Sequence, residues 1–216
     1  MAVTQTEITL DTIDGLVLAG EVAVPPSPWA TGVVCHPHPL YGGDMRNTVV
    51  GAMFDALAAA GVAALRFDFR GVGRSEGRHG GGVDERLDVF AAIDAVASLA
   101  ADGPLVLFGY SFGALVALDV VDVRLSGWVA VAPPLTTRQG GGSGADRLAG
   151  GDHRPKLVLA AEHDEFAPYP AAAESTAGWR STTVEPIPMA DHFLAGRTGW
   201  VAERSVEFVR RLAHRS

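Results

Sequence analysis

Short apolar runs alternate with longer segments of helical periodicity along most of this 216-residue chain. Runs such as "LVLF" and "KLVLAA" do not alternate in polarity, which is typical of strands that are buried on both faces. The expected strands lie in "TGVVCHP", "VAALRFDF", "PLVLFGY", "GWVAVAP", "KLVLAAEHD" and "TTVEPIP". The helical segments between and after them are 47–60, 83–101, 112–121, 171–179 and a last one that ends at Leu212. This order predicts a parallel sheet with helices on both of its faces.

The beginning of the chain follows a different pattern. Two β-prone segments, "TEITLDT" and "LVLAGEVAVP", flank Ile13-Asp14-Gly15, and Asp-Gly between such segments predicts an antiparallel hairpin. A single α/β core can exceed 200 residues, so residues 1–216 are interpreted as one domain. The predicted fold class is α/β: a mostly parallel, doubly wound sheet with an N-terminal antiparallel hairpin.

Charge and cysteine content exclude several classes of function. The net charge of −8 argues against the basic face of a nucleic-acid-binding protein. We find no run of about 18 apolar residues, so no membrane span is expected. The first residues lack the basic and apolar regions of a signal peptide, and a lone cysteine, Cys35, fits a reducing compartment. We therefore expect a cytoplasmic protein that acts on a small molecule.

The pattern G-x-S-x-G, which marks an activated serine on a strand-to-helix turn, occurs twice. Ser75 is followed by "GRHGGG", which cannot propagate a helix, so we predict that this serine lies in a structural loop. Ser111 lies between the strand "LVLF" and the helical segment "FGALVALDVV". Gly109 and Gly113 would leave room where the helix crosses the strand. Ser111 is the predicted nucleophile, and a simple helix N-cap is the alternative.

A serine hydroxyl needs a general base and a third group that orients the base. In this architecture the order along the chain is serine, acid, histidine, each on a loop after a strand. Asp164 follows "KLVLAA", and His192 follows "TTVEPIP" and precedes the last helix. Asp191 and His163 are poorer candidates, because side chains that are consecutive in sequence diverge. The predicted trio is Ser111, Asp164 and His192.

Acyl transfer also requires amide donors for the developing oxyanion. One donor is the amide after the nucleophile, here Phe112, and the other comes from the loop "CHPHPLYGGD". Pro37 and Pro39 have no N–H, which leaves His38 as the first choice and Leu40 as the second.

The same loop offers an alternative interpretation as a metal site. His36, His38 and Asp44 carry nitrogen and oxygen ligands, but no second cluster stands at a recognisable spacing. No metal is therefore predicted. Cys35 lies inside a strand and is interpreted as a core residue, and Asp68 as a partner of loop amides.

Four blocks, "CHPHPLYGGDMRNTVV", "RFDFRGVGRSEG", "GYSFGALVA" and "AEHDEFAP", resemble the α/β-hydrolase superfamily in this order. The resemblance covers nearly the whole chain and is to small, lidless members related to dienelactone hydrolase and serine esterases. It implies a Ser111–Asp164–His192 triad and a structural loop around Ser75. The chain departs from dienelactone hydrolases at the elbow, where they have a cysteine.

Many superfamily members carry a helical cap after the sixth strand. The segment 135–154, which is rich in glycine, is too short for a cap, so we expect an open pocket near Tyr41, Tyr110, Phe112 and Phe166. Whether this segment gates the site is left open.

The predicted function is hydrolysis of small carboxylic esters through an acyl-enzyme, without a cofactor. A thioesterase and an amide or peptide hydrolase are the alternatives within the enzyme class. A non-catalytic ligand-binding protein, and a scaffold that only forms a homodimer, are the alternatives outside it.

Overall fold

The computed structural model describes residues 3–100, 102–136 and 146–214. Within these residues one sheet has the strand order β1-β2-β4-β3-β5-β6-β7-β8. Its strands are β1 (Thr4–Asp11), β2 (Val17–Val24), β3 (Ala30–Cys35), β4 (Val62–Phe67), β5 (Leu105–Tyr110), β6 (Leu125–Val131), β7 (Lys156–Ala161) and β8 (Thr182–Ile187). The α-helices are α1 (Thr48–Ala59), α2 (Glu85–Val96), α3 (Phe112–Leu118), α4 (Leu148–Gly151), α5 (Tyr169–Ser175) and α6 (Thr198–Ala213). A short 3-10 helix, η1, spans Pro39–Tyr41.

The N-terminal hairpin is present as predicted. Strands β1 and β2 pair in antiparallel register from Thr4 opposite Val24 to Asp11 opposite Val17. Gly15 has a φ of 86° in the turn between them, a conformation that favours glycine. Strand β2 also pairs antiparallel with β4, whereas the pairs from β4 to β8 are parallel. The sheet is therefore mostly parallel, with the hairpin at one edge.

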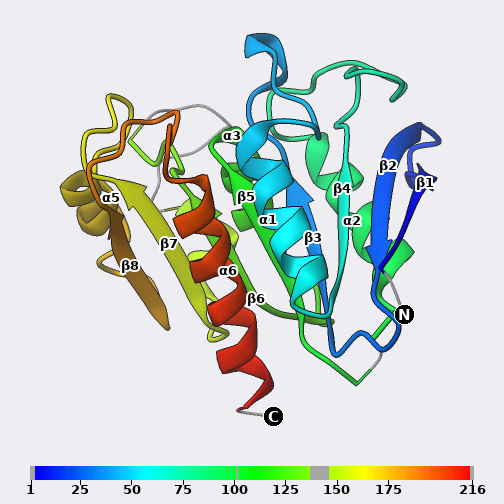
Figure 1. Cartoon of the computed structure of the whole chain (residues 1–216). Coiled ribbons are helices and arrows are strands. Elements are labelled where there is room, and N and C mark those ends of the chain that lie inside the picture. Colours follow the sequence, from blue (N-terminus) through cyan, green and yellow to red (C-terminus); the bar gives the residue numbers. More distant parts are fainter. Residues whose placement is uncertain (1–2, 101, 137–145, 215–216) are drawn as a thin grey trace.

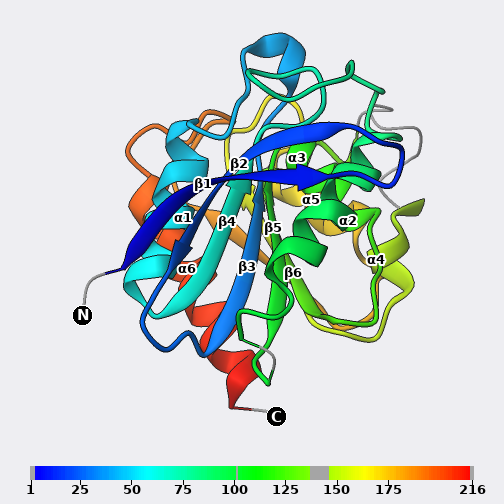
Figure 2. The same cartoon turned by 90° about the vertical axis from the view of Figure 1, so that its right-hand side faces the viewer.

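Helices cover both faces of the sheet (Figures 1 and 2). Helices α1 and α6 pack together on one face, while α2, α3 and α5 lie on the other. Neighbouring residues of β3 illustrate the arrangement, because Val33 packs into one core cluster and Val34 into the other. Both side chains are fully buried. This explains why the strand runs are continuously apolar in the sequence.

Three helices differ from the prediction by two or more residues at an end, and one of them, α3, ends at Leu118 instead of residue 121. Helix α2 occupies Glu85–Val96 instead of 83–101, and α5 occupies Tyr169–Ser175 instead of 171–179. After α2 the chain must turn sharply into β5, and a methyl group at Gly103 would lie 2.1 Å from the carbonyl oxygen of Trp29. Helix α5 begins directly after Pro168, whose extended backbone acts as the N-cap.

The connection between β6 and β7 carries no cap domain in its described part, where α4 is the only α-helix. Residues 137–145 lie outside the described residues, and the question whether 135–154 gates the site falls on them. Arg147, immediately before α4, is buried and forms an ion pair with Asp119 at the end of α3. This pair attaches the C-terminal part of the connection to the helical layer.

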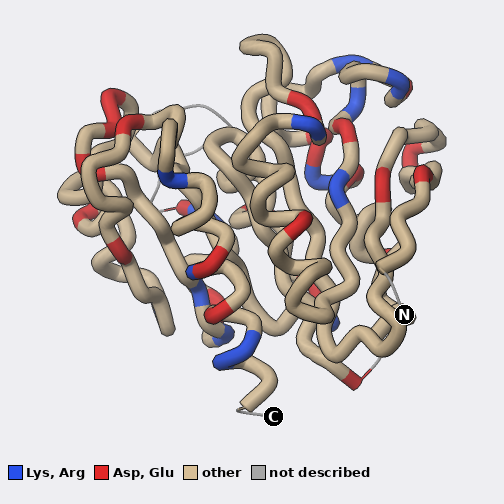
Figure 3. Tube along the Cα trace, in the orientation of Figure 1, with Lys and Arg blue, Asp and Glu red and all other residues tan. Residues whose placement is uncertain are grey.

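Charged residues are distributed over the molecule in small groups of mixed sign (Figure 3). Arg204 on α6, for example, contacts Glu185 on β8 and Glu207 on its own helix. No helix among the described residues is both long and apolar enough to cross a membrane.

Candidate active site

Ser111 stands on the sharp turn between β5 and α3. Its φ of 53° and ψ of −117° lie in a region that residues with a side chain rarely adopt. A methyl group at Gly109 would lie 2.4 Å from the Gly113 carbonyl oxygen, and one at Gly113 would lie 2.4 Å from that of Cys35. The two glycines therefore permit the close crossing of helix and strand, as predicted.

Three side chains form a continuous chain of hydrogen bonds. Ser111 Oγ lies 2.9 Å from His192 Nε2, and His192 Nδ1 lies 2.8 Å from Asp164 Oδ2. All three residues are buried, with exposed fractions of 8%, 8% and 3%. Because the carboxylate accepts the Nδ1–H, Nε2 carries the lone pair and can accept the serine proton. The structure thus brings the three predicted residues together.

Asp164 is held by more than the histidine. Its Oδ1 accepts hydrogen bonds from the amides of Phe166 (2.8 Å) and Ala167 (3.2 Å). Burial alone would raise the pKa of this carboxyl group. The His192 hydrogen bond and charge and the two amides outweigh it, so the pKa of Asp164 lies below its usual range. The carboxylate is therefore ionised whenever it orients the imidazole.

The loop that carries His192 follows β8, which lies three strands away from β5 in the sheet. Tyr110, which directly precedes Ser111, binds this loop, because its hydroxyl donates a hydrogen bond of 2.8 Å to the His192 carbonyl oxygen. Burial, together with the charges of Asp164 and Asp191, raises the pKa of Tyr110 to about 12. The hydroxyl therefore stays a donor. Tyr110 is a predicted pocket residue, but this anchoring role has no local signal in the sequence.

The two amides predicted first as oxyanion donors belong to residues near Ser111: Phe112 follows it directly, and His38 lines the same cavity. Phe112 is the first residue of α3, so its N–H has no acceptor within the helix. Within the described ranges, no protein acceptor contacts the N–H of either Phe112 or His38. The rings of these two residues lie 4.8 Å apart between centroids, which places the two residues side by side.

The second-choice donor, Leu40, is a correction to the sequence analysis. Its amide donates to His38 Nδ1 at 3.2 Å, and its side chain lies at the exposed tip of the loop. The imidazole caps the start of η1 and occupies the Leu40 amide.

An open cavity of about 490 Å³ borders Ser111 and His192. The predicted residues Tyr41, Tyr110 and Phe166 line it. Three lining residues that the sequence analysis did not name are Asn47, Pro134 and Phe193. Phe193 follows His192 directly and is 67% exposed, so an aromatic residue at that position was the signal that could have identified it.

The chain matches known hydrolases over most of its length. Residues 42–150, just over half of the chain, match the family described as serine aminopeptidase, S33. An α/β serine hydrolase homologue from Coxiella burnetii is 30% identical, with a TM-score of 0.78 over 94% of this chain and 97% of that one. An α/β serine hydrolase without a lid from Xanthomonas campestris is 28% identical, with a TM-score of 0.81 over 97% and 95% of the two chains. The chain belongs to the serine aminopeptidase S33 family of α/β-hydrolases.

Two further similarities are partial or distant. An uncharacterized protein of Rickettsia prowazekii is 40% identical over 125 residues, which make up 56% of this chain and 52% of that protein. The match therefore spans about half the length of that relative. An esterase from Pyrococcus furiosus has a TM-score of 0.84 over 98% of this chain and 92% of that one, but its 18% identity shows the fold alone. The assignment to a hydrolase family therefore rests on the S33 family match and the Coxiella burnetii structure.

The other G-x-S-x-G serine of this S33-family hydrolase has a structural role. The Ser75 hydroxyl donates to the carbonyl oxygen of Asp68 (2.7 Å) and accepts from the amide of Ala19 (2.9 Å). It thereby joins the loop after β4 to β2. Asp68 accepts from the amide of Met45 at 2.8 Å, as expected for a residue that binds loop amides.

Both ring nitrogens of His36 likewise form hydrogen bonds within the fold. Its Nδ1 donates to the Pro37 carbonyl oxygen (2.7 Å), and its Nε2 accepts from the amide of Phe69 (3.0 Å). Burial lowers the pKa of His36 to about 4, so the ring is neutral. Across the described part of the chain, no group of three or more His, Cys, Asp or Glu residues could hold a metal ion.

Proposed function

We propose that this protein is a serine hydrolase that cleaves small, uncharged carboxylic esters through an acyl-enzyme intermediate. The observation that carries the proposal is the unbroken chain of hydrogen bonds from Ser111 through His192 to Asp164, which begins at an open cavity. Ser111 is the nucleophile, His192 is the general base, and Asp164 orients the imidazole.

In the first half-reaction, Ser111 Oγ attacks the acyl carbon of the ester while its proton passes to His192 Nε2. The Phe112 and His38 amides donate to the resulting oxyanion. The ester C–O bond then breaks, and the imidazolium, which Asp164 stabilises, gives the proton to the leaving alcohol. In the second half-reaction, water gives a proton to His192 and attacks the acyl carbon. The acid leaves, and the proton returns to Ser111 Oγ.

The cavity lining favours an uncharged substrate. Cleavage of a peptide from its amino end requires a group that recognises the substrate's ammonium, most simply a carboxylate. Among the described residues that line the cavity there is no Asp, Glu, Lys or Arg. Four aromatic side chains face it instead, those of Tyr41, Tyr110, Phe166 and Phe193. This lining supports an apolar ester over an aminoacyl or peptide substrate, despite the name of the family.

Labelling with a fluorophosphonate probe tests the chemistry, and a substrate panel tests the class. Wild-type protein should react with the probe at Ser111, and Ser111→Ala should not. In a panel of p-nitrophenyl esters, acyl thioesters and aminoacyl p-nitroanilides, we expect the highest kcat/KM with the esters. An unlabelled wild-type protein would favour the non-catalytic alternative, and a preference for anilides or thioesters would move the proposal to those classes.

A further inference from the structure

The loop that follows Ser75 packs against the residues that carry the oxyanion donors. The ring centroid of His79 lies 4.9 Å from that of His38 and 5.3 Å from that of Phe112. Since His38 and Phe112 lie 4.8 Å apart, the three rings contact one another pairwise. We call His38, His79 and Phe112 the ring cluster. Two of its three members carry the amides assigned to the oxyanion hole.

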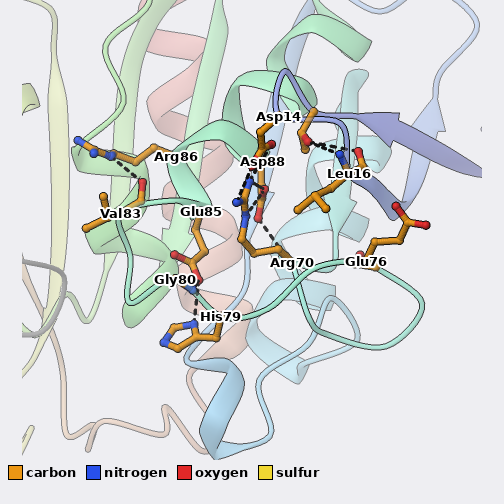
Figure 4. Close-up of polar contacts among 12 residues, drawn as sticks. Asp14, Leu16, Arg70, Glu76, His79, Gly80, Val83, Glu85, Arg86 and Asp88 are labelled. Atoms are coloured by element: carbon orange, nitrogen blue, oxygen red, sulfur yellow. Dashed lines mark hydrogen bonds and ion pairs between the residues drawn. The ribbon is translucent and has the colours of Figure 1, made fainter.

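His79 also contacts a buried carboxylate of α2. Glu85, the first residue of α2, is fully buried, and its Oε1 lies 2.8 Å from His79 Nδ1 (Figure 4). The contact is short, but it lacks the direction of an N–H···O hydrogen bond. The two oxygens of Glu85 accept the amides of Gly80 and Gly82, each at 2.7 Å. The carboxylate thus binds the glycine-rich turn, and the imidazole of His79 lies against the His38 ring.

The His38 loop needs such a support. The amides of Tyr41 and Gly43 donate to the His38 carbonyl oxygen, and these hydrogen bonds lie within the turn. They do not fix the turn against α3. The tip is open to solvent, with Leu40 71% and Tyr41 81% exposed. The ring cluster is a side-chain contact that connects this exposed turn to the first residue of α3.

We propose that His79, held by Glu85, is a positioning residue for the oxyanion hole. Its ring supports the His38 ring, so that the His38 amide stays directed at the same point as the Phe112 amide. This inference rests on the proposed function. His79 does not line the cavity at Ser111, so its effect should reach the transition state through His38 and leave substrate binding unchanged.

The test compares His79→Ala, His79→Phe and Arg78→Ala on the best ester of the panel. Arg78 is the matched control, because it is exposed on the same loop and belongs to no part of the ring cluster. The readouts are kcat, KM, the thermal midpoint and inhibition by an alkylboronic acid, whose serine adduct places an oxygen in the oxyanion hole.

For His79→Ala we expect kcat to fall about 10-fold with KM unchanged, a part of the roughly 10²–10³-fold that loss of a whole oxyanion donor costs. Boronate inhibition should weaken by a similar factor. His79→Phe, which restores a ring, should recover kcat to within about 3-fold of wild type. Arg78→Ala should behave as wild type. The phenylalanine variant keeps the test valid if the alanine variant folds poorly.

Three results would overturn the inference. The first is an active wild type whose His79→Ala variant keeps its kcat. The second is a loss that appears in KM or in the thermal midpoint alone. The third is a His79→Phe variant as impaired as His79→Ala. A wild-type protein that neither hydrolyses the panel nor reacts at Ser111 would instead overturn the proposed function, and the inference with it.

Discussion

The hydroxyl of Tyr110 donates a 2.8 Å hydrogen bond to the carbonyl oxygen of His192, a residue 82 positions away in the sequence. Tyr110 ends β5 and directly precedes Ser111, so the strand that presents Ser111 also binds the backbone of His192. The end of β5 is therefore in contact with both residues of the Ser111–His192 pair. Asp164 fixes the orientation of the imidazole, and Tyr110 fixes its place.

Replacing Tyr110 with phenylalanine should separate these two effects. The ring remains, but the His192 carbonyl oxygen loses its donor in a buried position, which costs about 1 kcal/mol of stability. We expect kcat to fall about 3- to 10-fold with little change in KM, because His192 is placed less accurately. Steady-state kinetics and urea unfolding measure both quantities. Tyr169→Phe is the control, and an unchanged kcat in Tyr110→Phe would show that the loop is fixed by other contacts.

Asp164→Asn should preserve the shape of the site and remove its activity. The amide nitrogen of asparagine cannot accept the Nδ1–H of His192, which favours the wrong tautomer and leaves the imidazolium without a counter-charge. A loss of about 10⁴ in kcat is expected, as for the same change in other serine hydrolases. Asp191→Asn is the control, because that carboxylate accepts the amides of Phe193 and Leu194, which asparagine can also do. Equal activities in the two variants would reject Asp164 as the orienting residue.

Ser111→Gly and Ser111→Ala should both be inactive but should differ in stability. Both lack the hydroxyl, whereas only glycine adopts a φ of 53° and a ψ of −117° without strain. In the alanine variant such strain costs about 1–3 kcal/mol of stability. The glycine variant avoids the strain but loses roughly 0.5–1 kcal/mol, because glycine gives the unfolded chain more conformational entropy. We expect the glycine variant to be about 1 kcal/mol more stable than the alanine variant in chemical denaturation. Equal stabilities would mean that the elbow stores no strain.

The main features of the fold and the candidate site could be predicted where the determining signal is local. Strands buried on both faces have no polar alternation, and the elbow requires a strand, two glycines and a helix within a few residues. Asp164 and His192 could be predicted because parallel strands bring their carboxyl ends to one edge of the sheet. For the same reason Ser75, which no helix follows, could be assigned to a loop.

What could not be predicted depends on contacts between distant segments. The amide of Leu40 was a candidate donor because the sequence excludes only prolines, and it is the fold that directs the His38 ring onto that amide. Nothing near Tyr110 or His79 in the sequence indicates that they contact the His192 backbone and the His38 ring. Helix ends such as Val96 are set by the turn that the next strand requires.

His36 should make the stability of the protein depend on pH. Its pKa is about 4 in the folded state, against about 6.5 for an exposed histidine, because burial disfavours the charged ring. Above pH 6.5 the ring is neutral in both states, and its contribution to stability is fully present. As the pH falls from 6.5 toward 4, only the unfolded chain binds the proton. Folding is therefore disfavoured by about 2 kcal/mol at pH 5.

The variant His36→Gln isolates this contribution, since a neutral amide can accept the Phe69 N–H and donate to the Pro37 carbonyl oxygen without binding a proton. Urea unfolding at pH 7 and pH 5 should show a smaller loss of stability in the variant than in the wild type, by about 2 kcal/mol. The comparison uses the difference between two pH values, so a constant cost of the substitution cancels. Equal losses in the two proteins would mean that His36 is protonated in the folded state, and its hydrogen bond from Phe69 could then not be as the structure has it.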